Sequence, residues 1–362
     1  MSISSALEPN FFSEKIIHWY QKHKRDLPWR HTRDPYLIWL SEIILQQTRV
    51  KQGLPYFHRF VEAFPTIYDL AEASEQEVLR LWQGLGYYSR ARNLHSCAKT
   101  VVASNDGEFP LNYKELRQLK GIGTYTAAAI ASFAYNEKVA VVDGNVYRVL
   151  ARVFGLKEDI LSTKGQHKFQ KLADMLVPDG LAGEYNQAIM EFGALQCTPR
   201  NPACLLCPLN TICFAYQHTE QSSLPVKIKK VKIKKRYLSY ILIRQGDKIY
   251  MKERTSKDIW RGLYDFYSIE SKHEVQNIEK LDDPLVAEII KTANPTVEMS
   301  GLYRHQLTHQ QLWVRFFTLI LGEHRLADSL LIEKSLTAYN VEEVKNLPKP
   351  ILIDNYLSEV IF

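Results

Sequence analysis

The sequence of 362 residues has no apolar run as long as the ~18 residues that a membrane span needs. Its first ten residues, MSISSALEPN, lack the organisation of a secretory signal peptide. There is no internal repeat, and no low-complexity segment apart from one lysine-rich run. These absences exclude a membrane-spanning chain and predict a cytoplasmic globular protein with two or three domains.

Positive charge is scarce outside one short run. Between Val226 and Tyr237 lie seven lysines and arginines and no acidic residue, and without them the net charge of +6 becomes −1. The overall charge therefore does not predict nucleic-acid binding. The run itself has two interpretations, a segment that contacts phosphate or a solvated linker.

Cysteine is also scarce, and four of the five cysteines lie within seventeen residues, at Cys197, Cys204, Cys207 and Cys213. In a chain without a secretion signal this clustering predicts metal binding rather than disulfides. Only one close pair resembles the paired ligands of zinc sites, so the spacing favours a 4Fe–4S cluster over zinc. Arg200 lies inside the first loop of the cluster, where it can face phosphate.

Helical periodicity runs through the first two-thirds of the chain, and no convincing strand appears before residue 225. After the basic run the period changes from 3.6 to 2, which predicts strands. We therefore expect an all-α body over 1–215, a basic linker over 216–236 and an α+β domain over 237–362. Helices are expected at 11–27, 36–50, 53–63, 66–72, 75–83, 89–104, 144–154, 164–177, 181–195, 284–292, 341–346 and 350–361. A hairpin is expected at 237–252, and another strand at 312–321.

A tight turn between two helices is the clearest single motif. Gly121 and Gly123 flank one apolar residue, and so sharp a bend between helices is expected to exclude side chains. The turn directs backbone N–H groups outward at a helix N-terminus, which suits one phosphate. About twenty residues later, Asp143-Gly144-Asn145 opens another helix. A phosphate-binding turn close to a carboxylate at a helix N-terminus predicts chemistry on a nucleic acid.

Two carboxylates are candidates for that chemistry. Glu42 shares an apolar helix face with Ile38 and Leu45, so its pKa should be raised, which suits a general acid; the alternative is a structural glutamate. Asp143 is a candidate helix N-cap, and the N–H groups there should lower its pKa and keep it ionised. One neutral and one charged carboxyl is the division that cleavage of a glycosidic bond needs.

Three further clusters have two interpretations each. Gln46, Gln47 and Thr48 either reach base edges or end the buried part of a helix. The turn at 84–90 either presents its tyrosines as a wedge between bases or buries them in a core. The segment 305–309 contains two histidines, and we interpret it as a polar recognition loop rather than a metal site.

Taken together, the motifs closely resemble the A/G-specific adenine DNA glycosylases of the MutY family, in the helix-hairpin-helix glycosylase superfamily. The matching stretches are LPWRHTRDPYLIWLSEIILQQTRV, LWQGLGYYSRARNL, LKGIGTYTAAAI, VVDGNVYRV and the four cysteines, followed by IWRGLYDF and HQLTH near the C-terminus. The resemblance covers nearly the whole chain. It implies a helix-hairpin-helix body with an iron–sulfur loop, followed by a Nudix-like domain.

The resemblance also implies roles for single residues. Glu42 would protonate a ring nitrogen of a flipped adenine. Asp143 would stabilise or transiently trap the sugar cation, with Asn145 and Tyr125 around it, before water completes the hydrolysis. Gln47, Tyr87 and Arg30 match residues that enter the gap in the duplex or line the base pocket. The cluster would shape a DNA-contacting loop.

The C-terminal domain lacks the Glu-rich helix of Nudix hydrolases, so it should read the opposing 8-oxoguanine through Leu307, Thr308 and His309. The family usually has Phe-Ser-His there, and it has a proline where this hairpin has Lys120. Endonuclease III has a lysine nucleophile at the position of Tyr125, and a Schiff base needs an amine. A monofunctional glycosylase is therefore expected.

The expected partner is duplex DNA with an 8-oxoguanine:adenine or guanine:adenine mispair, bound by a monomer. The linker is a candidate docking segment for replication or mismatch-repair proteins. The alternatives are an endonuclease III-like lyase acting on oxidised pyrimidines and a catalytically silent iron–sulfur DNA-binding protein.

Overall fold

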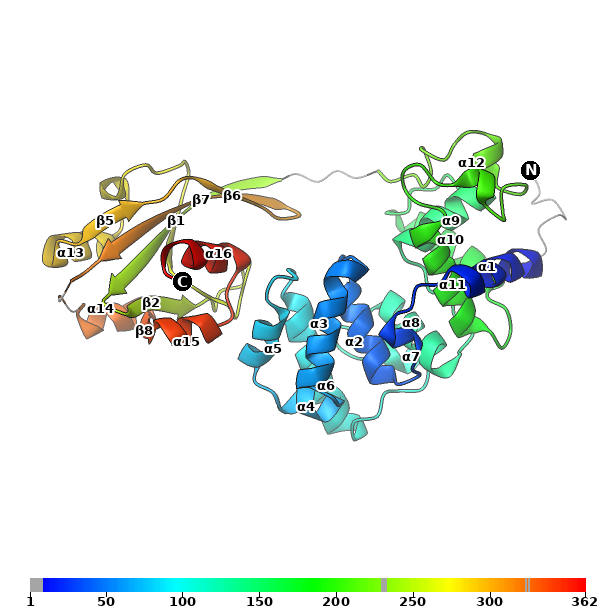
Figure 1. The fold of residues 1–362 in the computed structure, drawn as a ribbon, viewed down its shortest axis with the longest axis horizontal. Helices are drawn as coiled ribbons and strands as arrows, with labels where there is room; N and C mark the ends of the chain where they lie inside the picture. Colours follow the sequence, from blue (N-terminus) through cyan, green and yellow to red (C-terminus); the bar gives the residue numbers. More distant parts are fainter. Residues whose placement is uncertain (1–8, 229–232, 323, 325) are drawn as a thin grey trace. The chain divides into compact units, whose positions relative to one another are not determined.

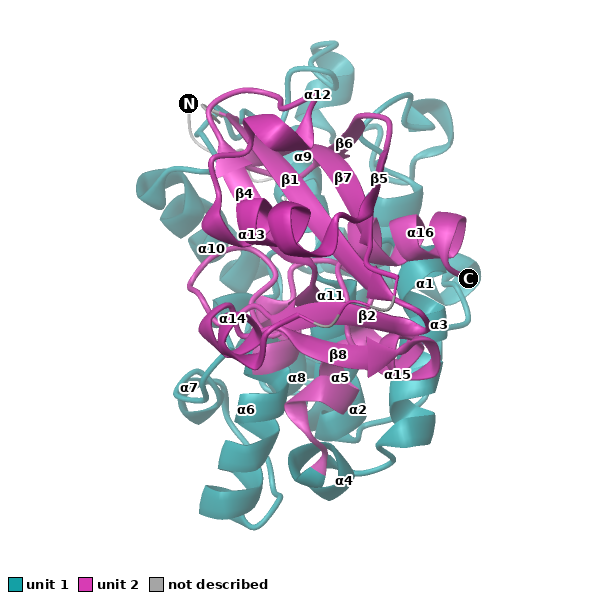
Figure 2. Ribbon diagram, turned by 90° about the vertical axis from the view of Figure 1, so that its left-hand side faces the viewer, with its two compact units in different colours: residues 1–72, 93–229 teal, residues 73–92, 230–362 magenta. Residues whose placement is uncertain are grey.

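The structure is a computed structural model that describes residues 9–228, 233–322, 324 and 326–362. The chain forms two compact units, residues 1–72 with 93–229 and residues 73–92 with 230–362 (Figure 2). The second unit thus includes α5 (Glu75–Trp82), where the Gln76 amide donates to the Tyr264 hydroxyl at 2.7 Å. The domain boundaries expected from the sequence remain a prediction. Within the described residues, no helix has both the length and the apolar content to cross a bilayer.

The first unit is helical, as expected (Figure 1). Its elements are α1 (Pro9–His23), η1 (Pro28–Arg30), α2 (Pro35–Leu45), α3 (Val50–Ala63), α4 (Ile67–Glu72), α6 (Ser89–Asn105, whose first turn belongs to the second unit), α7 (Tyr113–Leu116), α8 (Thr124–Tyr135), α9 (Gly144–Phe154), α10 (Thr163–Leu176), α11 (Ala182–Leu195), η2 (Cys204–Leu206) and α12 (Phe214–Gln217). Apolar side chains on one face of α9, among them Val149 and Leu150, share a core with α1, α10 and α11. This core holds the start of α9 in place.

Helix α2 begins as the sequence suggests but ends earlier. The Asp34 side chain caps it by accepting from the Tyr36 N–H at 2.8 Å, and a proline occupies its first turn. We expected the helix to reach residue 50, and this was wrong, because it ends at Leu45. Gln46 leaves the helical region with ψ 117°, and Gln47 has φ +56°. The polar residues after Leu45 therefore lie in a bend and not on a further helical turn.

The second unit is built on a mixed sheet in which strands pair in the order β3-β2-β1-β7-β5. Its strands are β1 (Lys234–Gln245), β2 (Lys248–Glu253), β3 (Tyr264–Asp265), β4 (Tyr267–Ser271), β5 (Thr296–Met299), β6 (Tyr303–Gln306), β7 (Gln310–Ile320) and β8 (Thr337–Asn340); the helical elements beside α5 are η3 (Ile278–Lys280), α13 (Pro284–Ala293), α14 (Asp328–Glu333), α15 (Val341–Asn346) and α16 (Ile351–Val360). The expected β1–β2 hairpin is confirmed, and β1 also pairs in parallel with β7.

Side chains of β1 alternate between two cores, because successive residues of a strand point to opposite faces. Tyr240 and Leu242 pack with α15 and α16, and Ile241 and Ile243 pack with α13. Both faces of the central strand are therefore covered by helices, as in the expected α+β domain.

The basic run is not all linker. β1 begins at Lys234, inside the segment 216–236 that we expected to be a linker. Arg236 is 8% exposed, and its guanidinium donates to Asp258 at 2.8 and 2.9 Å and to Glu270 at 2.7 and 2.9 Å. Its positive charge is therefore paired with carboxylates of the second unit. Residues 229–232 of the run lie outside the described residues, so their proposed contact with phosphate or with partners stays a prediction.

Candidate active site

Glu42 is a buried carboxyl in the middle of α2, with 6% of its surface exposed. Tyr125, in the first turn of α8, donates its hydroxyl to Glu42 Oε2 at 2.5 Å. Burial raises the pKa of Glu42 to about 7, and the negative charge of Asp143 adds to this, whereas the Tyr125 hydrogen bond and the Arg30 charge lower it. The predicted rise in pKa is confirmed. Glu42 can therefore carry a proton at neutral pH and give it to a bound group.

Asp143 caps α9, which confirms its predicted structural role. Its Oδ1 accepts from the backbone N–H groups of Asn145 and Val146, both at 2.8 Å, and its Oδ2 accepts from the Asn145 side-chain amide at 2.8 Å. The predicted lowering of its pKa was wrong, because burial raises the pKa by more than these hydrogen bonds lower it. Three donors nevertheless favour the anion at Asp143, whereas Glu42 accepts a hydrogen bond from Tyr125. A proton shared between these carboxyls is therefore best placed on Glu42.

A cavity of about 40 Å³ opens beside Glu42. Trp29, Ile38 and Met190 form its apolar walls, and Arg30 and Gln187 contribute polar groups. This lining, apolar walls with a few polar groups, is of the kind that binds a flat heterocycle, but a cavity of about 40 Å³ must widen to admit one. Arg30, Phe133 and Gln187 also line a neighbouring cavity of about 400 Å³, so these side chains lie between the two spaces.

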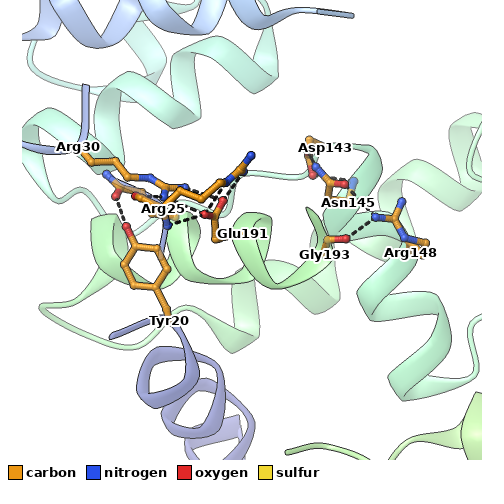
Figure 3. A network of polar contacts seen from close by, with 9 residues as sticks. Tyr20, Arg25, Arg30, Asp143, Asn145, Arg148, Glu191 and Gly193 are labelled. Carbon is orange, nitrogen blue, oxygen red and sulfur yellow. Dashed lines mark hydrogen bonds and ion pairs between the residues drawn. The ribbon is translucent and has the colours of Figure 1, made fainter. Parts of the chain in front are cut away.

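Two arginines converge on one buried carboxylate (Figure 3). Glu191 on α11 is 1% exposed and accepts from Arg25 at 2.6 and 2.8 Å and from Arg30 at 2.8 and 3.0 Å. Although burial acts in the opposite direction, these partners lower the pKa of Glu191 to about 2. The carboxylate is therefore ionised at any physiological pH, and it fixes the Arg30 guanidinium in place.

Arg148 connects the start of α9 to the cysteine loop. Its guanidinium donates to Asn145 Oδ1 at 2.9 Å and to the Gly193 carbonyl at 2.6 Å (Figure 3), and its Nε donates to the Cys197 carbonyl at 2.7 Å. Asn145 in turn donates to Asp143. A continuous set of hydrogen bonds therefore runs from the first cysteine to the carboxylate that caps α9.

The four clustered cysteines fit an iron–sulfur site by their chemistry. None of the four forms a disulfide, all are partly buried, and Arg152 donates to Cys197 Sγ at 3.5 Å. Burial, followed by repulsion between neighbouring thiolates, raises the pKa of Cys204, Cys207 and Cys213. Bound iron would offset this cost, since a metal stabilises the thiolate form. Across the described residues no three ligand side chains converge closely enough for a single metal ion.

The hairpin needs glycine at one of its two positions. Gly121 has φ +87°, and an added Cβ would lie 2.9 Å from the Cβ of Asn93. Gly123 has φ −85°, and a Cβ there would meet nothing within 4 Å, so the expectation that the bend excludes both side chains was wrong for Gly123. Gly123 is the N-cap of α8, and its open surroundings leave room for a phosphate at the helix N-terminus.

The two residues expected to enter the duplex share an unusual backbone. Gln47 and Tyr87 both have left-handed φ angles, +56° and +49°, and both are exposed. Such angles cost about 1–3 kcal/mol for residues other than glycine and cluster at functional sites. Tyr88, by contrast, is buried. The two interpretations of the tyrosine pair therefore separate, with Tyr87 as the candidate wedge and Tyr88 in the core.

The expected recognition loop is the turn between β6 and β7. Thr308 and His309 are exposed at its tip, and Thr308 contacts the Tyr87 hydroxyl within the second unit. His305 packs edge-on against Trp260 at 5.7 Å, and burial lowers its pKa. These residues line one cavity of about 530 Å³. Arg200, in the cysteine loop of the first unit, is also exposed.

Comparison with known proteins places the chain in a family. Residues 40–175 match the HhH-GPD superfamily of base excision DNA repair proteins, residues 197–213 the iron-sulfur binding domain of endonuclease III, and residues 239–359 the NUDIX domain. An adenine DNA glycosylase of Buchnera aphidicola (subspecies Schizaphis graminum) is 36% identical over 271 residues, which are 75% of this chain and 78% of the relative. The chain belongs to the adenine DNA glycosylase family.

Two further proteins are similar to this chain. The adenine DNA glycosylase of Mus musculus is 43% identical over 230 residues, 61% of this chain and 45% of the relative. The solved structure of a thermostable thymine-DNA glycosylase has a TM-score of 0.53 at 31% identity, covering 58% of this chain and 97% of the other. With the matching iron–sulfur domain, the cofactor of this family member is a 4Fe–4S cluster held by the cysteine loop.

Several residues of this site were not found from the sequence. Arg148 and Arg152 are buried on α9. Their spacing of four residues among hydrophobic residues could have indicated two buried arginines. Glu191 lies between Met190 and Phe192 on α11, a similar sign. Their partners, however, lie up to 166 positions away in the chain, which no local pattern indicates.

Proposed function

We propose that this adenine DNA glycosylase is monofunctional and removes adenine opposite 8-oxoguanine or guanine in duplex DNA. The observation that carries the proposal is the pairing of Glu42, buried with a raised pKa, with Asp143, which three donors hold at the start of α9. This pair supplies the two charge states that cleavage of an N-glycosidic bond requires.

In the proposed reaction, the flipped adenine enters beside Glu42 and widens the small cavity there. Glu42 gives its proton to a ring nitrogen of the base, so that the electrons of the breaking C–N bond leave on a neutral adenine. The anionic Asp143 stabilises the positive charge that develops on the sugar, and Asn145 keeps that carboxylate oriented. Water then adds to the sugar carbon, and its proton returns to the carboxylate pair.

Other groups serve binding rather than chemistry. The N–H groups at Gly121 and Gly123 hold one phosphate, and Arg200 contacts another. Gln47 and Tyr87 enter the gap left by the flipped base. Thr308 and His309 contact the opposing 8-oxoguanine. When bound, the cluster would hold the cysteine loop in place. The Cys197 carbonyl of this loop accepts a hydrogen bond from Arg148.

Tyr125 distinguishes this proposal from a lyase. Its hydroxyl donates to Glu42 and offers no amine for a Schiff base. The purified protein should therefore cleave an 8-oxoguanine:adenine duplex at the adenine only after heating in alkali, and should leave an adenine:thymine duplex intact. Borohydride should trap no covalent adduct. A mispaired strand that stays intact after alkali would refute the proposal, and strand cleavage without alkali would point to a lyase.

A further inference from the structure

Arg30 is close to two carboxyl groups, Glu42 and Glu191, and its positive charge favours the ionised form of each. It lines the same small cavity as Glu42, and its positive charge lowers the pKa of that residue. On its other side it forms two hydrogen bonds with Glu191, at 2.8 and 3.0 Å, and a third with the Arg25 carbonyl at 2.8 Å. With 11% of its side chain exposed, Arg30 is held firmly in this position.

The surroundings of Glu42 contain few charges. Tyr125 faces it from α8, Asp143 from the start of α9 and Arg30 from η1. Arg30 is the cation among these groups, so its position decides whether a positive charge faces the proton donor. An arginine that paired directly with Glu42 would favour the carboxylate and remove the proton that the reaction uses.

We propose that Glu191 is a positioning residue that keeps the Arg30 guanidinium hydrogen-bonded to itself and not to Glu42, so that Glu42 keeps its proton. Glu191 touches neither the base nor the sugar in this scheme, and it acts only through Arg30. The inference rests on the proposed role of Glu42 as the acid in adenine removal.

The test is the pH dependence of adenine excision by Glu191→Gln in the full-length, cluster-bearing protein. Freed from its partner, Arg30 should turn to Glu42 and lower the midpoint of the alkaline limb of kcat/KM by about one pH unit, since a nearby opposite charge lowers a carboxyl pKa by about 1–3 units. Starting from a pKa of about 7, excision should be about five-fold slower at pH 7, about ten-fold slower at pH 8.5 and nearly unchanged at pH 5.5.

Three further variants separate this effect from a general loss of structure. Arg25→Gln removes the other arginine and leaves Arg30 paired, so its midpoint should not fall. Arg30→Gln/Glu191→Gln removes the freed cation, so its midpoint should return to the wild-type value or above. If Glu191→Gln does not fold with two unpaired arginines, Arg25→Gln/Glu191→Gln leaves one and should show the same downward shift.

The outcomes are distinct. An equal loss of rate at every pH in Glu191→Gln, or a midpoint that stays low in Arg30→Gln/Glu191→Gln, would overturn the role of Glu191. Both results would leave adenine excision by the wild-type protein intact. A wild-type protein that removes no adenine would instead refute the proposed function itself.

Discussion

Replacing Glu42 by Gln should stabilise the first unit at alkaline pH, even though it removes the proposed proton donor. A carboxyl whose pKa is raised in the folded state is neutral in both states below about pH 4.5, so it costs nothing there. As the pH rises from 4.5 through about 7, the unfolded chain gains from ionisation while the buried carboxyl resists it. The cost of folding is complete above pH 7.

The size of this cost follows from the structure. The difference between 4.5 and about 7, at about 1.36 kcal/mol per pKa unit, amounts to about 3 kcal/mol. An amide does not ionise, and its oxygen can still accept a hydrogen bond from the Tyr125 hydroxyl. This cost should therefore be absent in the Glu42→Gln variant. At roughly 2–4 °C per kcal/mol for a unit of this size, the variant should melt about 6–12 °C above the wild type at pH 8.

The assay is thermal unfolding of both proteins between pH 5.5 and 8.5, with the difference in Tm plotted against pH. That difference should grow with pH and level off above pH 7. Glu62, exposed on α3, offers a matched Glu→Gln control that should shift Tm little at any pH. A Tm difference for Glu42→Gln that is negative or independent of pH would refute the reasoning that burial holds the proton on this residue.

Four further substitutions test other parts of the site. Tyr125→Phe removes the donor to the ionised form of Glu42, so the alkaline midpoint of kcat/KM should rise by up to about one pH unit; a fall would contradict the geometry. Gly121→Ala should destabilise the hairpin by about 1–2 kcal/mol, whereas Gly123→Ala should leave Tm unchanged and weaken only DNA binding, which a binding titration and melting curves would separate. Arg148→Gln should slow excision at least ten-fold with the 400 nm absorbance of the cluster retained, because it loses its contacts to Asn145 and Gly193; an unchanged rate would show that this connection is not needed.

The sequence predicted the elements of the fold well because their signals are local. The apolar periodicity of α9 and α11 and the alternation in β1 placed these elements to within a few residues. The end of α2 was missed because apolar residues run up to Leu45 and the polar residues beyond it are compatible with a helix. The left-handed backbone at Gln47 has no mark in the sequence.

The electrostatics of the site were harder to predict, because they depend on how many atoms surround a group. The donors to Asp143 were foreseeable from its position as a cap, but the degree of its burial was not, and burial reversed the expected pKa direction. Glu191 was not identified for a related reason, since its partners Arg25 and Arg30 lie 166 and 161 positions earlier in the sequence. Local motifs identified the proposed reacting pair, and tertiary packing sets the pKa shifts of its two carboxyls.

The most direct test of the account is the rate of adenine excision from an 8-oxoguanine:adenine duplex as a function of pH, measured as kcat/KM for the wild type and Glu42→Gln. We predict a wild-type alkaline limb with its midpoint near 7, and no measurable excision by the variant at any pH despite normal binding of the duplex. Excision by Glu42→Gln at the wild-type rate would contradict the central claim that this buried carboxyl supplies the proton.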